Sequence, residues 1–258
     1  MGPIQMGFLA SLAAGTMTVV GALPVLAGRS ISKRMNDVLL GFAAGVMLTA
    51  SFTSLITPGI VAATKLHGNV QIAALIAVAG VVLGVGFIAL LNEWIPHEHF
   101  FQGLQGPPDS TLKRIWLLVL AITIHNIPEG LAVGVGFANG DVARGTTLAI
   151  GIGLQNAPEG LAVAVALLAS GYTRTHAFAV AGLTGAVEPI SGLIGAYAVS
   201  LSELALPWAL TFAAGAMIYV ISHEIIPETH RHGYEDEATF GLTVGLVAML
   251  FLDVAYGG

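Results

Sequence analysis

Long apolar runs separated by short polar links make up almost the whole chain. A helix needs about 20 apolar residues to cross the hydrocarbon core of a bilayer. The runs are continuous and show no alternation of polar and apolar residues, which disfavours membrane strands. The sequence therefore predicts an all-α integral membrane protein with eight transmembrane helices, near residues 6–27, 38–62, 71–95, 115–138, 146–170, 177–200, 208–227 and 238–256.

Composition supports a lipid bilayer as the surroundings of the chain. The 258 residues are 55% hydrophobic and 9% charged, whereas soluble domains carry roughly 25% charged residues. The positive residues are scattered, which argues against nucleic acid as a partner, and the lack of cysteine excludes thiolate metal sites. The first run lacks the basic start of a secretory signal, so we expect it to remain as a span. Glycine pairs such as Gly41 with Gly45 and Gly241 with Gly245 favour close helix packing.

The links on alternate sides of the membrane differ in positive charge, which predicts the orientation. Cytoplasmic links are enriched in Lys and Arg, and seven such residues fall on one side against two on the other. We therefore expect a multi-pass protein of the cell (inner) membrane with both termini on the extracellular or periplasmic side. The richer side carries Arg29, Lys33, Arg34, Lys113, Arg114, Arg174 and Arg231, and the other side carries Lys65 and Arg144.

A polar motif interrupts two consecutive apolar runs. "HNIPEG" occupies residues 125–130 and "QNAPEG" occupies residues 155–160. Consecutive spans cross the membrane in opposite directions, so we expect the fourth and fifth spans to form an inverted pair, a layout that many transporters use for a site at the bilayer midplane. Pro128 and Pro158 are expected to loosen the backbone beside the polar side chains.

The polar side chains of the two motifs share helix faces. Residues four apart lie on one face of a helix, so His125 is expected beside Glu129, and Gln155 beside Glu159. Asn126 and Asn156 repeat at matching places. A charged residue at a helix centre costs at least about 2.5 kcal/mol and marks a functional site.

Two further residues extend this polar set. Glu188 in the sixth span is a third intramembrane carboxylate, and none of the three has a Lys or Arg in the spans to neutralise it. They require cations, or protons that would make them structural hydrogen-bond partners. Met47 in the second span is a soft donor, although methionine also packs well in apolar helices.

The donor types favour a transition metal. Imidazole and thioether groups suit d-block ions, whereas Mg²⁺ and Ca²⁺ sites rarely contain His or Met. The predicted donors therefore suit Zn²⁺, or Cd²⁺, Fe²⁺ or Mn²⁺, and they are His125, Met47, Glu129 and Glu159. Carboxylates that bridge two ions would also allow a two-metal site.

The paired motifs in consecutive spans of an eight-helix chain resemble those of the ZIP (Zrt-/Irt-like protein) family of divalent metal transporters, in particular its compact bacterial members. The resemblance implies a single transporter domain over residues 1–258, import of divalent ions by alternating access without ATP hydrolysis, and a binuclear midplane site. It implies a first metal position formed by Met47, His125, Glu129, Gln155 and Glu159, and a second formed by Asn126, Glu129, Asn156, Glu159 and Glu188.

The same resemblance implies an exit path for the ion toward the cytoplasm. His223 and Glu224, near the end of the seventh span, match a His–Glu pair of that path. The link between the third and fourth spans, with His97, Glu98 and His99, either receives released ions or is a plain solvated loop. Gln155 stands where many relatives have His, which would loosen binding or broaden the ion preference.

Two other functions compete with metal transport. A membrane-embedded metalloenzyme would also use bridged ions, but no soluble catalytic domain or nucleophile motif is evident, so we do not expect an enzyme. A proton- or sodium-coupled carrier of an organic solute would use the carboxylates as proton sites. The transported ion is cargo, and no resident cofactor is expected. The sequence leaves open the ion preference, the occupancy of the second position and whether the chain forms a homodimer.

Overall fold

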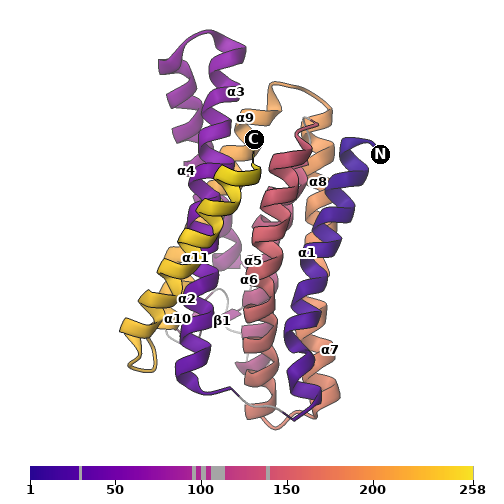
Figure 1. Cartoon of the computed structure of the whole chain (residues 1–258), viewed down its shortest axis with the longest axis vertical. Coiled ribbons are helices and arrows are strands. Elements are labelled where there is room, and N and C mark those ends of the chain that lie inside the picture. Colours follow the sequence, from indigo (N-terminus) through magenta and orange to yellow (C-terminus); the bar gives the residue numbers. More distant parts are fainter. Residues whose placement is uncertain (29–30, 95–96, 100–102, 106–113, 138–139, 258) are drawn as a thin grey trace.

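The computed structural model describes residues 1–28, 31–94, 97–99, 103–105, 114–137 and 140–257. In this part of the chain, eight helices are long and apolar enough to cross a membrane. The helices run roughly side by side, and both chain termini lie at the same end of the bundle (Figure 1). The predicted all-α membrane fold is confirmed.

Five spans are single helices and three are interrupted. The single helices are α1 (Pro3–Leu26), α4 (Val70–Trp94), α5 (Arg114–Phe137), α6 (Val142–Ala169) and α11 (Glu235–Tyr256). The second span consists of α2 (Lys33–Ala50), the π-helical segment η1 (Ser51–Ile56) and α3 (Thr57–His67). The sixth consists of α7 (Arg174–Thr184) and α8 (Val187–Ser200), and the seventh of α9 (Ala205–Val220), the π-helical segment η2 (Ile221–Ile225) and α10 (Ile226–Thr229).

The irregular backbone lies in other spans than we expected. Both α5 and α6 continue as helices through Pro128 and Pro158, so the loosening expected at these prolines does not interrupt either helix. A proline removes a single N–H, which a long helix packed on several sides tolerates. The π segments instead precede Pro58 and Pro227, and Thr57 Oγ1 donates to the Phe52 carbonyl at 2.9 Å beside the first of them.

The helices pack in two groups. The motif group contains α1, α5, α6, α7 and α8, and the flanking group contains α2, η1, α3, α4, α9, η2, α10 and α11. Glycines allow close packing within each group: a Cβ on Gly45 would collide with the backbone of Leu242 on α11, and one on Gly134 would collide with the backbone of Gly192 on α8. Between the groups, α2 contacts α6, and α5 contacts α9.

The link between α4 and α5 contains two short strands, β1 (His97–His99) and β2 (Gly103–Gln105), paired antiparallel. This hairpin lies outside the spans, where backbone groups of a short link can pair with one another. It does not alter the helical architecture.

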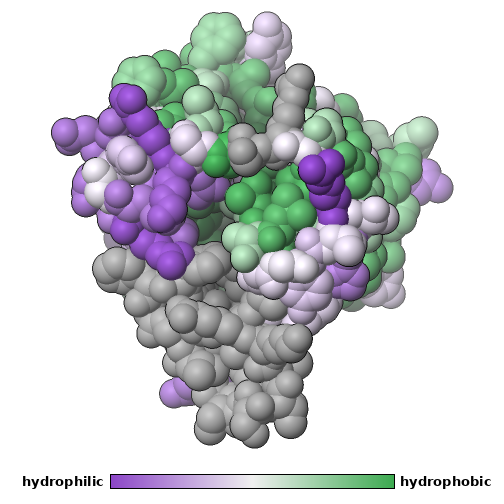
Figure 2. All heavy atoms as spheres, turned by 90° about the horizontal axis from the view of Figure 1, so that it is seen from below, coloured by the Kyte–Doolittle hydropathy of each residue, from purple (hydrophilic) through white to green (hydrophobic). Residues whose placement is uncertain are grey.

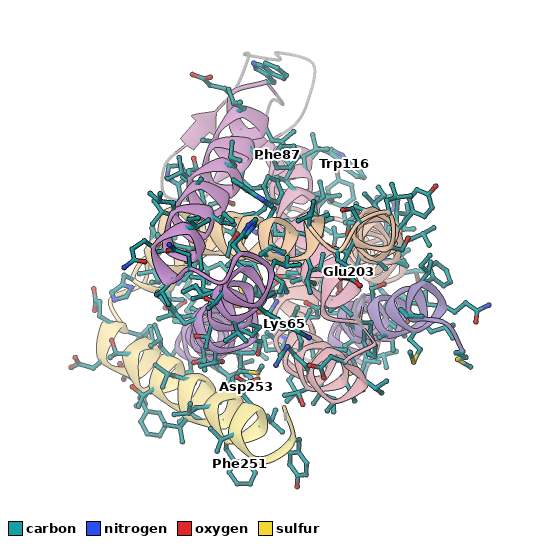
Figure 3. The ribbon with its side chains drawn as sticks, turned by 90° about the horizontal axis from the view of Figure 1, so that it is seen from above. Lys65, Phe87, Trp116, Glu203, Phe251 and Asp253 are labelled. Carbon is teal, nitrogen blue, oxygen red and sulfur yellow. The ribbon has the colours of Figure 1, made fainter. Side chains whose placement is uncertain are left out.

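Large apolar side chains cover the outside of α4 and α11. Leu75 and Val78 on α4, and Phe251 and Val254 on α11, are each more than 60% exposed, and Phe251 points away from the bundle in Figure 3. Such exposure is costly in water but not in lipid, so these faces are the ones in contact with the bilayer.

Candidate metal centre

The two copies of the motif lie on α5 and α6, which pack against each other. Gln155 Nε2 of the second copy donates to Glu129 Oε1 of the first at 2.6 Å. Both side chains are fully buried. The fold therefore joins the two motifs directly, at a depth that water reaches poorly.

The break in the sixth span brings a third carboxylate to this point. Because α8 starts at Val187, Glu188 lies in its first turn. Asn156 Nδ2 donates to Glu188 Oε1 at 2.8 Å and to the Ala14 carbonyl of α1 at 2.9 Å. One amide thus connects α1, α6 and α8.

Glu159 lies one turn after Gln155 on α6, and neither of its carboxylate oxygens has a hydrogen-bond partner. Its charge is close enough to Glu129 and Glu188 for the carboxylates to repel one another. Repulsion between buried like charges is strong because the surrounding dielectric constant is low. A cation bound among the three carboxylates would replace this repulsion by attraction.

Several of the predicted metal ligands have buried oxygens without hydrogen-bond partners. Leaving one buried acceptor unpaired costs about 1–3 kcal/mol, and more when it is charged. Carboxylate and amide oxygens are suitable ligands for divalent ions, so the residues fit the predicted cargo. Within the described residues these oxygens are Asn126 Oδ1, Glu129 Oε2, Gln155 Oε1, Glu159 Oε1, Glu159 Oε2 and Glu188 Oε2.

The two asparagines of the motifs also hold the helices in place. Asn126 Nδ2 donates to the Thr184 carbonyl at 2.9 Å, where α7 ends, and Asn156 Oδ1 accepts a bond from Gln155 Nε2 at 3.3 Å. Their amide N–H groups therefore support the break in the sixth span, and only their oxygens are suited to bind a cation.

Met47 lies on α2, in the flanking group. It is fully buried in a hydrophobic cluster that includes Ala50 of the same span, Ile152 on α6 and Met217 on α9. Its position next to α6 is compatible with both interpretations of this residue, as packing and as a soft donor.

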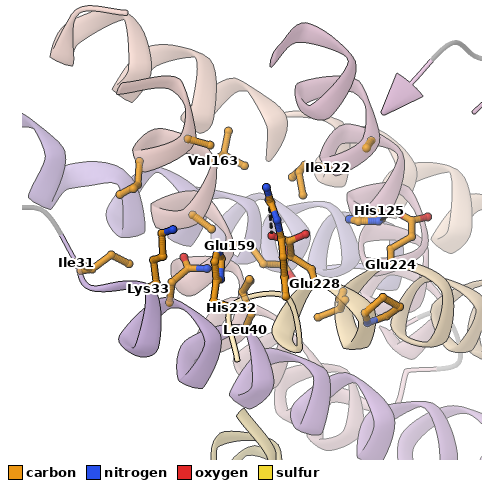
Figure 4. Close-up of a pocket in the computed structure, with 18 of the residues that line it drawn as sticks. Ile31, Lys33, Leu40, Ile122, His125, Glu159, Val163, Glu224, Glu228 and His232 are labelled. Carbon is orange, nitrogen blue, oxygen red and sulfur yellow. Dashed lines mark hydrogen bonds and ion pairs between the residues drawn. The ribbon is translucent and has the colours of Figure 1, made fainter. Parts of the chain in front are cut away.

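His125 has a partner that the sequence pattern did not indicate. Although it lies one turn before Glu129 on α5, its Nε2 is paired with Glu224 Oε2 of η2 (Figure 4). The two side chains are 5% and 2% exposed, respectively. This contact connects the motif to the residues expected along the exit path, and it crosses from the motif group to the flanking group.

Residues around Glu224 make further contacts beside the His125–Glu224 pair. Tyr219 of α9 stacks on His223 with ring centroids 4.8 Å apart. Asn92 of α4 donates through Nδ2 to Glu224 Oε1 at 3.2 Å. Asn92 was missed in the sequence analysis, and the signal that could have indicated it is a lone amide near the end of an otherwise apolar run.

The predicted residues are connected mainly through pairwise hydrogen bonds. Within the described part of the chain, no three His, Asp or Glu side chains converge to hold a metal ion. An ion that used the unpaired oxygens would have to open the contacts of Gln155 with Glu129 and of Asn156 with Glu188. The candidate centre is thus assembled from carboxylates and amides of α5, α6 and α8.

A cavity of about 240 Å³ leads from one end of the bundle to these residues. We call this the basic end, because α2 and α7 begin there (Figure 1), and the first turns of these helices contain Lys33, Arg34 and Arg174. Seen from below, it is hollowed between a hydrophilic patch and an apolar wall (Figure 2). The buried residues of its lining include His125, Glu159 and Glu224, and the more exposed ones include Lys33, Glu228 and His232 (Figure 4).

A second cavity of about 540 Å³ opens at the opposite end, near the chain termini. Its lining includes Lys65, Arg144 and Glu203, and Lys65 and Glu203 lie near the middle of the bundle when seen from that end (Figure 3). The buried residues of its lining include the apolar Val135 and Leu210, whereas the lining of the first cavity includes Glu159. The structure is therefore open to the candidate centre from the basic end.

Comparison with known proteins agrees with the architecture and the motifs. A family described as ZIP zinc transporter matches residues 102–253. The zinc transporter GufA of Myxococcus xanthus is 47% identical over 251 residues, which cover 97% of this chain and 99% of that protein. The zinc transporter ZIPB of Bordetella bronchiseptica is 48% identical over 240 residues, which cover 93% and 78% of the two chains.

The similarity extends to animal proteins. The zinc transporter ZIP11 of Homo sapiens is 37% identical over an alignment of 322 positions that covers 93% of this chain and 94% of that protein. These matches far exceed the identity and coverage needed to assign a family, and they argue for a transporter that is not an enzyme. The chain belongs to the ZIP family and is a multi-pass membrane protein that transports divalent metal ions such as zinc across the membrane.

Proposed function

We propose that this protein imports Zn²⁺, and with it Cd²⁺, Fe²⁺ or Mn²⁺, into the cytoplasm through a binuclear site at the bilayer midplane. The observation that carries the proposal is the set of unpaired oxygens on the buried residues Glu129, Glu159 and Glu188, of which Glu159 lines a cavity. Three buried carboxylates that repel one another are a stable arrangement only with bound cations or protons.

The first metal position uses Met47, His125, Glu129, Gln155 and Glu159. This assignment requires His125 to exchange Glu224 for the ion, by a rotation of its side chain. The soft donors Met47 and His125 favour transition metals over Mg²⁺ or Ca²⁺. Gln155 supplies an amide oxygen, which holds the ion less tightly than an imidazole nitrogen would.

The second metal position uses Asn126, Glu129, Asn156, Glu159 and Glu188, with Glu129 and Glu159 bridging the two ions. Its affinity is lower than that of the first, because Asn156 already donates a hydrogen bond to Glu188 and brings no charge of its own. The second ion therefore mainly neutralises the carboxylates that the first position shares.

The direction of transport follows from the charge distribution. The positive-inside rule assigns the basic end to the cytoplasm of a cell (inner) membrane, with both termini on the other side. The cavity that leads from that end to Glu159 is then the release route.

The proposed mechanism is alternating access by a rigid-body shift of the motif group against the flanking group. The inverted pair α5 and α6 belongs wholly to the first group, while Met47 and Glu224 belong to the second. A shift would therefore change the distance between the carboxylates and these two residues. All 258 residues act as one transport domain in this mechanism.

Uptake of radioactive Zn²⁺ into proteoliposomes tests the proposal. Wild-type protein should accumulate the ion, with competition from Cd²⁺, Fe²⁺ and Mn²⁺, and the variants His125→Ala and Glu159→Ala should lose most of the uptake while remaining folded. Wild-type uptake in a protein carrying both substitutions would refute the site. Metal titration of the purified protein separates metal transport from carriage of an organic solute, for which no tight metal binding is expected.

A further inference from the structure

Asn92 is a buried polar residue on α4, a helix with a largely lipid-facing surface. Its exposure is 3%, and the mean hydropathy of the span reaches 2.8. An amide at such a place is retained against the cost of removing it from water. Its N–H group has partners that offset part of this cost, whereas its carbonyl oxygen has none among the described residues. Its hydrogen-bond partner Glu224 lines the proposed release route.

The amide group holds one oxygen of Glu224. Asn92 Nδ2 donates to Glu224 Oε1 at 3.2 Å and lies 3.5 Å from the Tyr219 hydroxyl. The orientation of the amide follows from charge, since a carboxylate must face the N–H side of an amide and repels its oxygen. The other carboxylate oxygen, Oε2, contacts His125.

The two carboxylate oxygens of Glu224 contact different helix groups. Asn92 on α4 and Glu224 on η2 both belong to the flanking group, whereas His125 on α5 belongs to the motif group. A carboxylate fixed through one oxygen presents the other in a constant direction, here toward the ring of His125, which lines the same cavity as Glu159. An ion leaving the metal centre meets an acceptor that is already oriented.

We infer that Asn92 is a positioning residue for metal release, which holds Glu224 so that its Oε2 receives the ion from His125. The inference rests on the proposed function of the neighbouring centre. Because the Asn92 amide is neutral, it orients Glu224 without adding a second negative charge. Glu224 therefore accepts the ion but does not retain it. A carboxylate at position 92 would have the opposite effect.

The test compares Asn92→Ala and Asn92→Asp with Asn69→Ala, in proteoliposomes that contain a Zn²⁺-sensitive dye. Asn69 is a matched control, because it lies next to the start of the same helix and accepts bonds from the backbone of Gln71 and Ile72, away from both cavities. Asn92→Ala should lower the maximal uptake rate about ten- to a hundredfold, the loss expected for one hydrogen bond to a charged group, with KM within about twofold of wild type.

Asn92→Asp should slow uptake at least as much and bind Zn²⁺ more tightly in titrations, because it adds a carboxylate beside Glu224. Wild-type kinetics in either variant would overturn the inference. So would a loss of rate in Asn92→Ala that merely parallels its content of folded protein. If wild-type protein shows no Zn²⁺ uptake, the proposed function itself fails, which is a distinguishable result.

Discussion

Replacing Glu159 with glutamine should stabilise the metal-free protein while abolishing its response to metal. Glu159 is buried, both of its oxygens lack hydrogen-bond partners, and it repels Glu129 and Glu188. The glutamine side chain has nearly the same shape, carries no charge and can donate a hydrogen bond to either neighbouring carboxylate.

The size of the effect can be estimated from the cost of unpaired buried groups. That cost is about 1–3 kcal/mol for each group, so Glu159→Gln should stabilise the metal-free protein by about 1–3 kcal/mol. For a chain of this length each kcal/mol shifts the melting temperature by about 2–4 °C, which predicts an increase of about 2–12 °C. Zn²⁺ at 100 times its Kd should stabilise wild type by about 2.7 kcal/mol, and this gain should disappear in the variant.

Thermal unfolding in detergent, with a chelator and with added Zn²⁺, measures both effects, and proteoliposome uptake measures the functional loss. Glu235→Gln is the matched control, because Glu235 is an exposed carboxylate in the first turn of α11 and its neutralisation should leave the response to Zn²⁺ intact. A Glu159→Gln protein that melts below wild type in chelator and keeps its Zn²⁺ shift would refute the assignment of Glu159 to a cation site.

Four other changes have expected outcomes. Gln155→His adds a nitrogen ligand and should tighten Zn²⁺ binding about tenfold, seen by titration, while lowering the maximal uptake rate; unchanged binding would argue against Gln155 as a ligand. Lowering the external pH from about 7.5 to about 5.5 should reduce uptake, because protons compete with the ion for carboxylate and imidazole groups, and a flat profile would contradict this. Gly45→Val should prevent α2 from packing on α11, so that little monodisperse protein is recovered by size-exclusion chromatography, whereas Gly86→Val, which faces open space, should behave as wild type. His232→Ala leaves the buried Asp37 without its 3.0 Å partner and should destabilise the protein by about 3 kcal/mol in thermal unfolding. Adding Asp37→Asn should recover part of this loss, and an equal loss in the double variant would show that it does not come from the charge of Asp37.

The hydrophobic pattern determined the helical fold because a bilayer allows few alternatives. Every backbone polar group in lipid must be paired within its own segment or barrel, so eight continuous apolar runs were sufficient to predict eight helical spans. The glycine pairs of α2 and α11 were also recognisable, since Gly41, Gly45, Gly241 and Gly245 repeat at helical spacing and do lie where the two helices meet. The short hairpin β1–β2 was not predictable from a pattern that describes spans.

The proximity of the two motifs was also an expectation from sequence, since consecutive spans joined by a short link tend to be neighbours. The contact of Gln155 with Glu129 agrees with it. In contrast, the positions of the irregular backbone were not predictable, because whether a proline opens a helix depends on the packing around it. Pro128 and Pro158 lie in continuous helices, while the breaks occur before Pro58 and Pro227 and between Thr184 and Val187.

The sequence by itself determined the membrane class, the number of spans, the repeated polar motif and the donor types that suit a divalent transition metal. All of these depend on local composition or on the period of a helix. Only the tertiary structure decided that His125 pairs with Glu224, that Asn92 holds the other oxygen of Glu224, and that Asn156 joins Glu188 to α1. These contacts join residues up to 142 positions apart in the chain, and no local pattern specifies which distant helix will supply the partner of a buried polar group.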